Sequence, residues 1–237
     1  MLEKSRPIKS LLFAHFSGLL WKGFTSSSKG TIMADQKIKV IIFDMGGVLV
    51  KTVDRNQRTE LAKKFNKSYE EIDKIVYGSE SSHKATLGEI SETDHFTNVL
   101  TSLGVPDYGI EEFQEEFWGG DELDQDLVEF ISSKKNQFRI GMLSNAMSDI
   151  RKWLMNHYEF LNFFEIVFFS AEQKMAKPDL EFYRAILKEF DVNPDEVIFI
   201  DDFVENIDAA KSLGMFAVHY HSTKQAIFEI NQILSHS

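Results

Sequence analysis

Three acidic side chains stand at the ends of two apolar runs. Asp44 ends "KVIIFD", and Asp201 and Asp202 end "EVIFIDD". Carboxylates that are held close together repel one another and lose their charge unless a cation lies among them. Mg²⁺ is a hard ion that prefers oxygen ligands and also accepts water and phosphate oxygens. If the chain brings these three acids together, they are expected to form a magnesium site.

Asp44 is also a candidate nucleophile, since a carboxylate can attack phosphorus and form an aspartyl phosphate. Ser144 and Asn145 end the run "RIGMLSN" and offer a hydroxyl and an amide, and Lys177 follows the run "EIVFFS" and offers a positive charge. Negative charge accumulates on the phosphoryl group during its transfer. These three residues are therefore expected to bind phosphate.

The residues that follow Asp44 include two glycines, Gly46 and Gly47. Without side chains, the backbone at these positions can approach a ligand closely. Main-chain N–H groups can then face phosphate oxygens, and the Gly46 carbonyl can face the metal. We expect Gly47 to lie in the phosphate site and Gly46 among the metal ligands.

The elements that must position these residues are strands of a parallel sheet. Continuous apolar runs of this length are typical of strands that are buried on both faces. The five runs span residues 39–44, 139–145, 165–170, 196–202 and 216–220. Amphipathic helical patterns lie between them, so the fold class is α/β, with a doubly wound, Rossmann-like parallel sheet. In such a sheet ligands bind beyond the carboxyl ends of the strands.

One interval is too long for a single crossover connection. Between Asp44 and Ser144 there are 100 positions (144 minus 44), whereas βαβ connections are usually much shorter. The patterning in this interval is helical. We expect a small inserted α-helical cap at residues 52–122 and a core made of residues 37–51 and 123–237.

Several of these residues also have a purely structural interpretation. Asp202 with Glu205 fits a helix capping box, and Ser144 and Asn145 could cap the helix that follows them. Lys177 could be a solvated loop charge. The placement of all of them at strand ends favours the chemical interpretation.

Composition limits the partners. The net charge of −11 argues against nucleic acid or an anionic membrane as a partner, and the absence of cysteine removes thiolate nucleophiles and zinc–thiolate sites. We expect a small phosphorylated molecule as the substrate, while the oligomeric state stays open.

Residues 1–36 are predicted to be an N-terminal extension. The first 32 residues hold five Lys or Arg and one acid, which fits either a transit peptide or a leader without a catalytic role. The apolar stretch at residues 11–21 is much shorter than the roughly 20 residues that span a bilayer. A cytoplasmic location is expected, or an organellar one if residues 1–32 are a transit peptide.

Four short motifs together resemble those of a known family. They are "FDMGGVL" at 43–49, "LSN" at 143–145, "KPD" at 177–179 and "IDDFVEN" at 200–206. From about residue 37 to 221 the chain resembles the haloacid dehalogenase-like hydrolase superfamily. It is similar to the phosphatase branch with a helical cap of the first type, which includes sugar-phosphate phosphatases and the N-terminal phosphatase of epoxide hydrolase.

The resemblance implies a role for each site residue. Asp44 would be the nucleophile, and Mg²⁺ would be bound by Asp44, the Gly46 carbonyl and Asp202, with Asp201 helping directly or through water. Ser144 and Lys177 would hold the phosphoryl group. The implied function is a Mg²⁺-dependent phosphatase that hydrolyses a small phosphorylated metabolite, such as a sugar phosphate, through an aspartyl phosphate.

Gly46 departs from the pattern of most phosphatases in the superfamily. They carry a second acid at this position, which protonates the leaving alkoxide and then activates water, and such help is worth roughly 10² to 10⁴ in rate. The chain could be a slow enzyme, use another acid or act on a good leaving group. It could also be a catalytically weak or inactive binding or regulatory protein.

Two other classes fit less well. Dehalogenases of 2-haloacids need no metal and usually carry an aromatic residue at the position of Gly46, so the pair Asp201 and Asp202 argues against that activity. Receiver domains have their acid pair early in the chain, whereas here it comes last.

Overall fold

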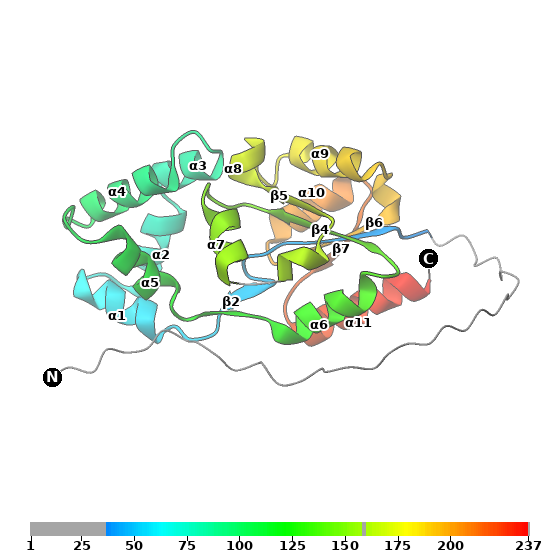
Figure 1. Cartoon of the computed structure of the whole chain (residues 1–237), viewed down its shortest axis with the longest axis horizontal. Helices are drawn as coiled ribbons and strands as arrows, with labels where there is room; N and C mark the ends of the chain where they lie inside the picture. The colour runs from blue at the N-terminus through cyan, green and yellow to red at the C-terminus, as the bar shows by residue number, and fades with distance from the viewer. Residues whose placement is uncertain (1–36, 158–159, 237) are drawn as a thin grey trace, which may run out of the picture. The chain divides into compact units, whose positions relative to one another are not determined.

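The computed structural model describes residues 37–157 and 160–236, so the predicted N-terminal extension lies outside the described residues. A five-stranded parallel sheet with the order β5-β4-β1-β6-β7 forms its centre (Figure 1). The strands are β1 (Val40–Phe43), β4 (Arg139–Ser144), β5 (Ile166–Phe169), β6 (Val197–Asp201) and β7 (Phe216–His219). All five predicted strands are confirmed, and so is the α/β fold class.

The central strand is buried on both faces, as its apolar run predicts. Ile41 and Phe43 contribute to one hydrophobic cluster, and Val40 and Ile42 contribute to another. This alternation follows from the two-residue period of a strand. Helices therefore cover the sheet on both sides, with α6 and α11 on one side and α9 and α10 on the other (Figure 1).

The helices around the sheet begin and end where the sequence provides signals. The main ones are α6 (Gln125–Lys134), α7 (Ile150–His157), α8 (Ser170–Gln173), α9 (Leu180–Phe190), α10 (Val204–Ser212) and α11 (Thr223–Ser235), with short 3-10 turns η1 (Phe160–Phe163) and η2 (Pro194–Glu196). The carboxylate of Asp179 caps α9 by accepting the Glu181 N–H. Gly214, with φ of +94°, follows the end of α10.

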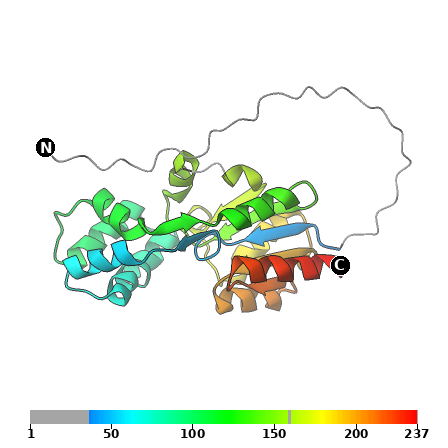
Figure 2. The same cartoon turned by 90° about the horizontal axis from the view of Figure 1, so that it is seen from below.

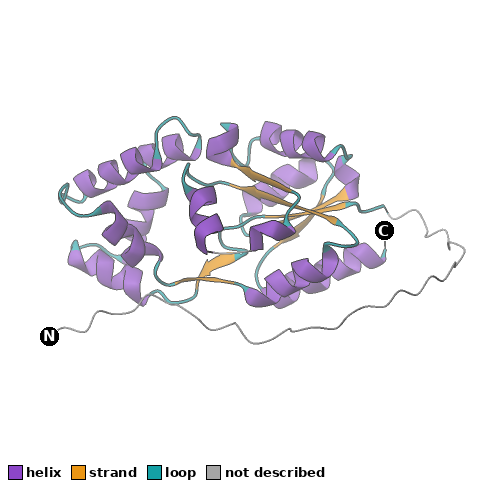
Figure 3. Ribbon diagram, in the orientation of Figure 1, coloured by secondary structure: helices purple, strands orange, loops and turns teal. Residues whose placement is uncertain are grey.

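Between β1 and β4 lies a helical insert with its own hydrophobic cluster (Figure 3). Its helices are α1 (Asn56–Lys64), α2 (Tyr69–Tyr77), α3 (Glu80–Thr86), α4 (Glu92–Ser102) and α5 (Ile110–Trp118). Phe96, Phe113 and Phe117 pack in this cluster. The ring centroid of Phe113 lies 6.0 Å from that of Phe96 and 5.9 Å from that of Phe117. These three phenylalanines thus belong to the core of the insert. Its assignment as a separate cap domain stays a prediction.

The sequence did not predict the two strands that join the insert to the sheet. β2 (Val50–Thr52) and β3 (Asp121–Leu123) pair antiparallel, with Thr52 opposite Asp121 (Figure 2). Each strand is three residues long and only partly buried, so neither has the apolar run that marks the five strands of the sheet.

A buried arginine ties this two-stranded ribbon to the insert. The guanidinium of Arg58 on α1 donates to Thr52 in β2 and forms ion pairs with Asp121 in β3 and Asp73 in α2. It also donates to the Phe117 carbonyl oxygen at 2.9 Å. A buried guanidinium needs such partners for its N–H groups. Arg58 therefore joins both strands of the ribbon to the helices of the insert.

At its other end the ribbon is bonded to α11. Lys51 forms an ion pair with Asp124 and donates to the Tyr220 hydroxyl at 2.8 Å, and Thr223 also bonds Asp124. Burial raises the pKa of Asp124, but the hydrogen bonds from Lys51 and Thr223 outweigh it, and the net pKa is lowered. The folded state thus favours the charged form of this carboxyl.

Replacing Asp124 by asparagine is expected to destabilise the protein by about 1–3 kcal/mol at pH 7, because hydrogen bonds to a charged acceptor are replaced by neutral ones. Asparagine still caps α6. Since the folded pKa lies below the unfolded value of 3.8, the stabilisation is full above that value and is lost as the pH falls through the folded pKa. Urea unfolding should therefore show that the difference in the free energy of unfolding between the wild type and Asp124→Asn shrinks at acidic pH. Asp126→Asn, at an exposed position of the same helix, is the control.

Candidate active site

The parallel register brings the predicted site residues to one edge of the sheet. Phe43 lies between Met142 of β4 and Ile200 of β6, so the residues after these positions emerge side by side. Asp44, Asp201 and Asp202 each offer one carboxylate oxygen, and these three oxygens lie within 4.8 Å of one another. Residues that are far apart in the chain thus form one acidic cluster.

Asp44 is held at this edge by a small set of donors. The residue is 6% exposed, and its Oδ1 accepts the Met45 N–H at 2.7 Å and lies 2.8 Å from the Lys177 ammonium. Burial raises the pKa of Asp44 to about 6, although Lys177 and a hydrogen bond from Ser144 pull it down. Ser144 is itself buried at the end of β4. Ser144 therefore lies at the same edge of the sheet as Asp44.

Lys177 lies between two carboxylates. Its Nζ is 2.8 Å from Asp44 Oδ1 and 2.7 Å from Asp201 Oδ2, and the residue is 5% exposed. Burial by itself lowers the pKa of this lysine, but attraction to Asp44 and Asp201 outweighs burial and raises it. Lys177 is thus an ammonium ion within the site, which excludes the solvated loop charge that was its structural alternative.

Asn145 positions Lys177 through the main chain. Its amide oxygen accepts the Lys177 N–H at 2.8 Å, and its amide nitrogen donates to the Lys177 carbonyl oxygen at 2.9 Å. The pair of bonds fixes the peptide of a residue 32 positions away in the chain. These contacts make Asn145 a positioning residue, and its predicted contact with phosphate stays a prediction.

Both carboxylate oxygens of Asp201 have hydrogen-bond partners within the protein. Its Oδ2 binds Lys177, while its Oδ1 accepts the Phe203 N–H at 2.8 Å and the Asn206 side-chain amide at 2.9 Å. Asn206 was part of a quoted motif, but no role was assigned to it from the sequence. Its position five residues after Asp201, on the first turns of α10, is a signal that could have identified it. Asp201 is therefore fixed before any ligand binds.

Asp202 differs, because its Oδ1 is buried and has no hydrogen-bond partner among the described residues. Burial and the neighbouring Asp201 raise its pKa. The N-cap of α10 is Phe203, without a side-chain cap bond, so the capping box predicted as an alternative for Asp202 does not form. Buried polar atoms are normally satisfied. An oxygen of this kind beside two other carboxylates is what a divalent cation would bind, so the residues fit Mg²⁺.

A histidine that the sequence did not single out supports the main chain of Asp202. The Nε2 of His219, at the end of β7, lies 3.0 Å from the Asp202 carbonyl oxygen. A carbonyl oxygen only accepts, so Nε2 carries the proton in this bond. His219 thus holds the backbone that carries the unpartnered carboxylate.

The two glycines have different roles in the geometry. Gly47 has φ of +75°, and a Cβ there would lie 2.2 Å from Asp202 Oδ2, so only glycine lets Asp202 approach the turn. The Gly47 N–H donates to the Val50 carbonyl at 2.9 Å, and its predicted contact with phosphate stays a prediction. A Cβ at Gly46 would have no atom within 4 Å. The position of a second acid is therefore open space.

Comparison with known proteins places the chain among phosphatases. Residues 38–214 match the family model described as haloacid dehalogenase-like hydrolase. The sesquiterpene phosphatase astK of Aspergillus oryzae is 30% identical over 83% of this chain and 96% of its own length. The D-ribitol-5-phosphate phosphatase of Bacteroides thetaiotaomicron is 27% identical over 75% of this chain and 89% of its own length.

Solved structures share the fold. A haloacid dehalogenase-like enzyme of Bacteroides thetaiotaomicron, in complex with magnesium and inorganic phosphate, superimposes with a TM-score of 0.67 at 22% identity, over 78% of this chain and 96% of that chain. Among the described residues, no helix is long and apolar enough to cross a membrane.

Proposed function

Because the chain belongs to the haloacid dehalogenase-like hydrolase family, we propose that it is a Mg²⁺-dependent phosphatase that hydrolyses a small phosphorylated metabolite through an aspartyl phosphate. One observation carries the proposal. The buried carboxylate of Asp44 lies beside Lys177, and one of its oxygens lies within 4.8 Å of one oxygen each of Asp201 and Asp202. A nucleophile, a fixed positive charge and a set of oxygen ligands thus share one site.

In this mechanism Asp44 attacks the phosphorus atom, and the bond between phosphorus and the ester oxygen breaks. The alcohol leaves as an alkoxide that takes its proton from water, since Gly46 offers no acid. The Oδ1 of Asp44 is held by the Met45 N–H and Lys177, which orients the carboxylate and leaves Oδ2 to form the new bond. The ammonium of Lys177 and the hydroxyl of Ser144 stabilise negative charge on the phosphoryl oxygens. Water then attacks the aspartyl phosphate, which releases inorganic phosphate and restores the carboxylate.

Mg²⁺ would be held by Asp44, Asp202 and the Gly46 carbonyl, with Asp201 helping directly or through water. When bound, it supplies positive charge that lowers the repulsion between a phosphate dianion and three carboxylates. The unpartnered Oδ1 of Asp202 supports this assignment. The helical insert would act as a cap that closes over the substrate.

The relatives do not agree on a substrate. One is named a sesquiterpene phosphatase and another a D-ribitol-5-phosphate phosphatase. Their shared feature is a phosphate ester of a small organic alcohol. The proposed substrate class is therefore a phosphate ester of a small organic alcohol.

Metal dependence provides the direct test. With p-nitrophenyl phosphate, whose leaving group needs no protonation, the protein is expected to release phosphate over many turnovers in Mg²⁺. EDTA should lower the rate at least 100-fold, because without the cation the clustered carboxylates repel the phosphate, and added Mg²⁺ should restore it. A rate that EDTA leaves unchanged would refute the metal assignment.

The open space at Gly46 supports one alternative, a binding or regulatory protein with little or no activity. The same assay separates the two functions. Fewer than one phosphate released per protein molecule in saturating Mg²⁺ would favour the alternative.

A further inference from the structure

Two large apolar side chains are exposed at the edge of the active site. Phe203 is 61% exposed and Val204 is 47% exposed, and they directly follow Asp202. The Phe203 N–H donates to Asp201 Oδ1 at 2.8 Å. The two residues therefore lie within a few bonds of the acidic cluster rather than on a remote surface.

The fold gives no reason for these residue types. Phe203 is the N-cap of α10 and makes no side-chain cap bond, although Ser, Thr, Asp and Asn stabilise that position best. The apolar residues of α10 that serve the core, Ile207 and Ala210, are buried. Single exposed apolar residues are common, but here two adjacent ones stand next to the acidic cluster, where an apolar part of a ligand would be able to pack on them.

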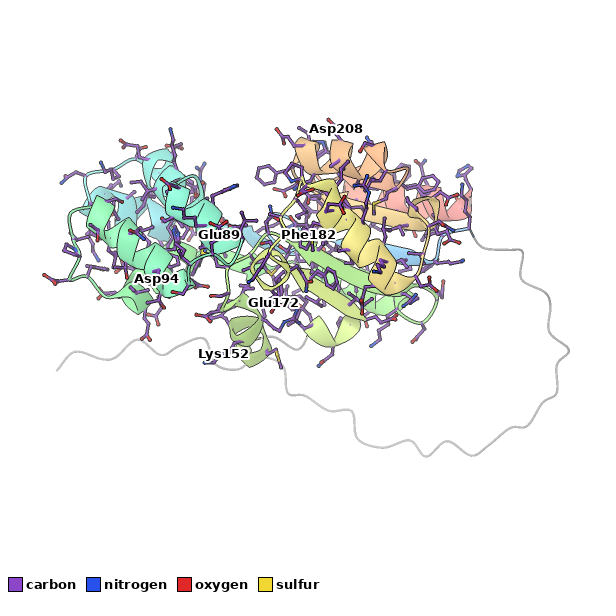
Figure 4. The ribbon with its side chains drawn as sticks, turned by 90° about the horizontal axis from the view of Figure 1, so that it is seen from above. Glu89, Asp94, Lys152, Glu172, Phe182 and Asp208 are labelled. Atoms are coloured by element: carbon purple, nitrogen blue, oxygen red, sulfur yellow. The ribbon has the colours of Figure 1, made fainter. Side chains whose placement is uncertain are left out.

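The charged residues that follow Phe203 and Val204 further restrict the chemical class of the ligand. The next exposed positions of α10 are Glu205 and Asp208, and Asp208 points outward into solvent (Figure 4). A second anionic group on the substrate would be repelled there. The hydroxyl groups of a sugar would find no hydrogen-bond partner on Phe203 or Val204. An uncharged hydrocarbon group is compatible with both the apolar pair and the acids beyond it.

We propose that the substrate is the phosphate ester of a hydrocarbon alcohol, with the phosphate at Asp44 and the hydrocarbon packed on Phe203 and Val204. This inference rests on the proposed phosphatase function and specifies its substrate class. It favours an apolar ester over the sugar phosphate expected from the sequence. Burial of the hydrocarbon against the exposed pair supplies the preference.

Octyl phosphate and glucose 6-phosphate are suitable probes, because both are esters of primary alcohols and have similar leaving groups. In Mg²⁺ we expect kcat/KM to be at least 10-fold higher for octyl phosphate, assayed below its micelle concentration. Phe203→Ser and Val204→Ser should each lower that value several-fold, mainly through KM, whereas Phe203→Leu should largely retain it. Phe228→Ser is the matched control, since Phe228 on α11 is also 61% exposed. This variant should leave kcat/KM unchanged for both probes.

Each other result counts against the inference. Equal kcat/KM for the two probes, or equal losses for both in Phe203→Ser and Val204→Ser, would overturn it while turnover of p-nitrophenyl phosphate left the phosphatase function intact. If no phosphate ester is turned over, the function itself fails and the inference with it. Circular dichroism of each variant checks that it is folded.

Discussion

Asp44→Asn is expected to lower kcat for p-nitrophenyl phosphate at least 1,000-fold, to near the background rate. Asparagine has almost the same shape as aspartate, but its amide oxygen does not form a covalent intermediate with phosphorus. Removal of a nucleophile in other enzymes has effects of this size or larger. Release of inorganic phosphate under saturating Mg²⁺ measures the loss. Retained activity would remove Asp44 from the chemistry.

Stability measurements show whether that loss comes from unfolding. The pKa of Asp44 is raised from 3.8 to about 6 by burial, so in metal-free buffer the folded protein binds a proton that the unfolded chain releases between these values. Wild-type stability should therefore fall, relative to Asp44→Asn, as the pH rises from about 4 to about 6. The variant should be at least as stable as the wild type at pH 7. A less stable variant would indicate a structural role for the charge.

Gly46→Asp is expected to raise kcat for alkyl phosphates by about 10-fold to 100-fold, a part of the roughly 10² to 10⁴ that a well-placed general acid contributes. A Cβ at this position meets no atom within 4 Å, and Gly46 is not among the glycines with positive φ. The new side chain thus has room beside the nucleophile. An alkoxide leaves poorly without a proton, so the gain should be large for octyl phosphate and small for p-nitrophenyl phosphate.

Gly46→Asn controls for the size of the new side chain, because asparagine cannot donate a carboxylic acid proton. It should leave both rates close to those of the wild type. An equal gain in the two variants would attribute the effect to packing or metal binding. No gain with aspartate would mean that another group already protonates the leaving alcohol.

The sheet and the gathering of the acids were predictable because each depends on a local pattern. The apolar runs predicted the five strands, and the polar residues at their ends included Asp44, Ser144, Asp201 and Asp202. Lys177 comes in the loop that follows α8. Parallel strands bring their carboxyl ends to one edge, so sequence order was enough to predict that these residues meet. The start of α9 at Asp179 and the end of α10 before Gly214 likewise depend on local capping chemistry.

The parts that were not predicted depend on contacts between distant residues. Nothing near Asn145 indicates that its amide bonds the Lys177 peptide, and nothing near Gly47 indicates that Asp202 fills the space beside it. Arg58 lies in a helix with many charged residues, a pattern that is typical of a solvent-exposed helix, although Arg58 itself is buried. β2 and β3 are too short and too polar to show a strand period.

The antiparallel ribbon also has a consequence for the history of the molecule. Thr52 and Asp121 are paired in this ribbon, so the helices of the insert begin and end at adjacent points of the chain's path. Closing a loop across them costs only about 2–3 kcal/mol more for the whole insert than for a tight turn. Recombination at this pair could therefore exchange the helices as a cassette without rethreading the strands. New substrate ranges could arise in this way while the catalytic edge is inherited unchanged.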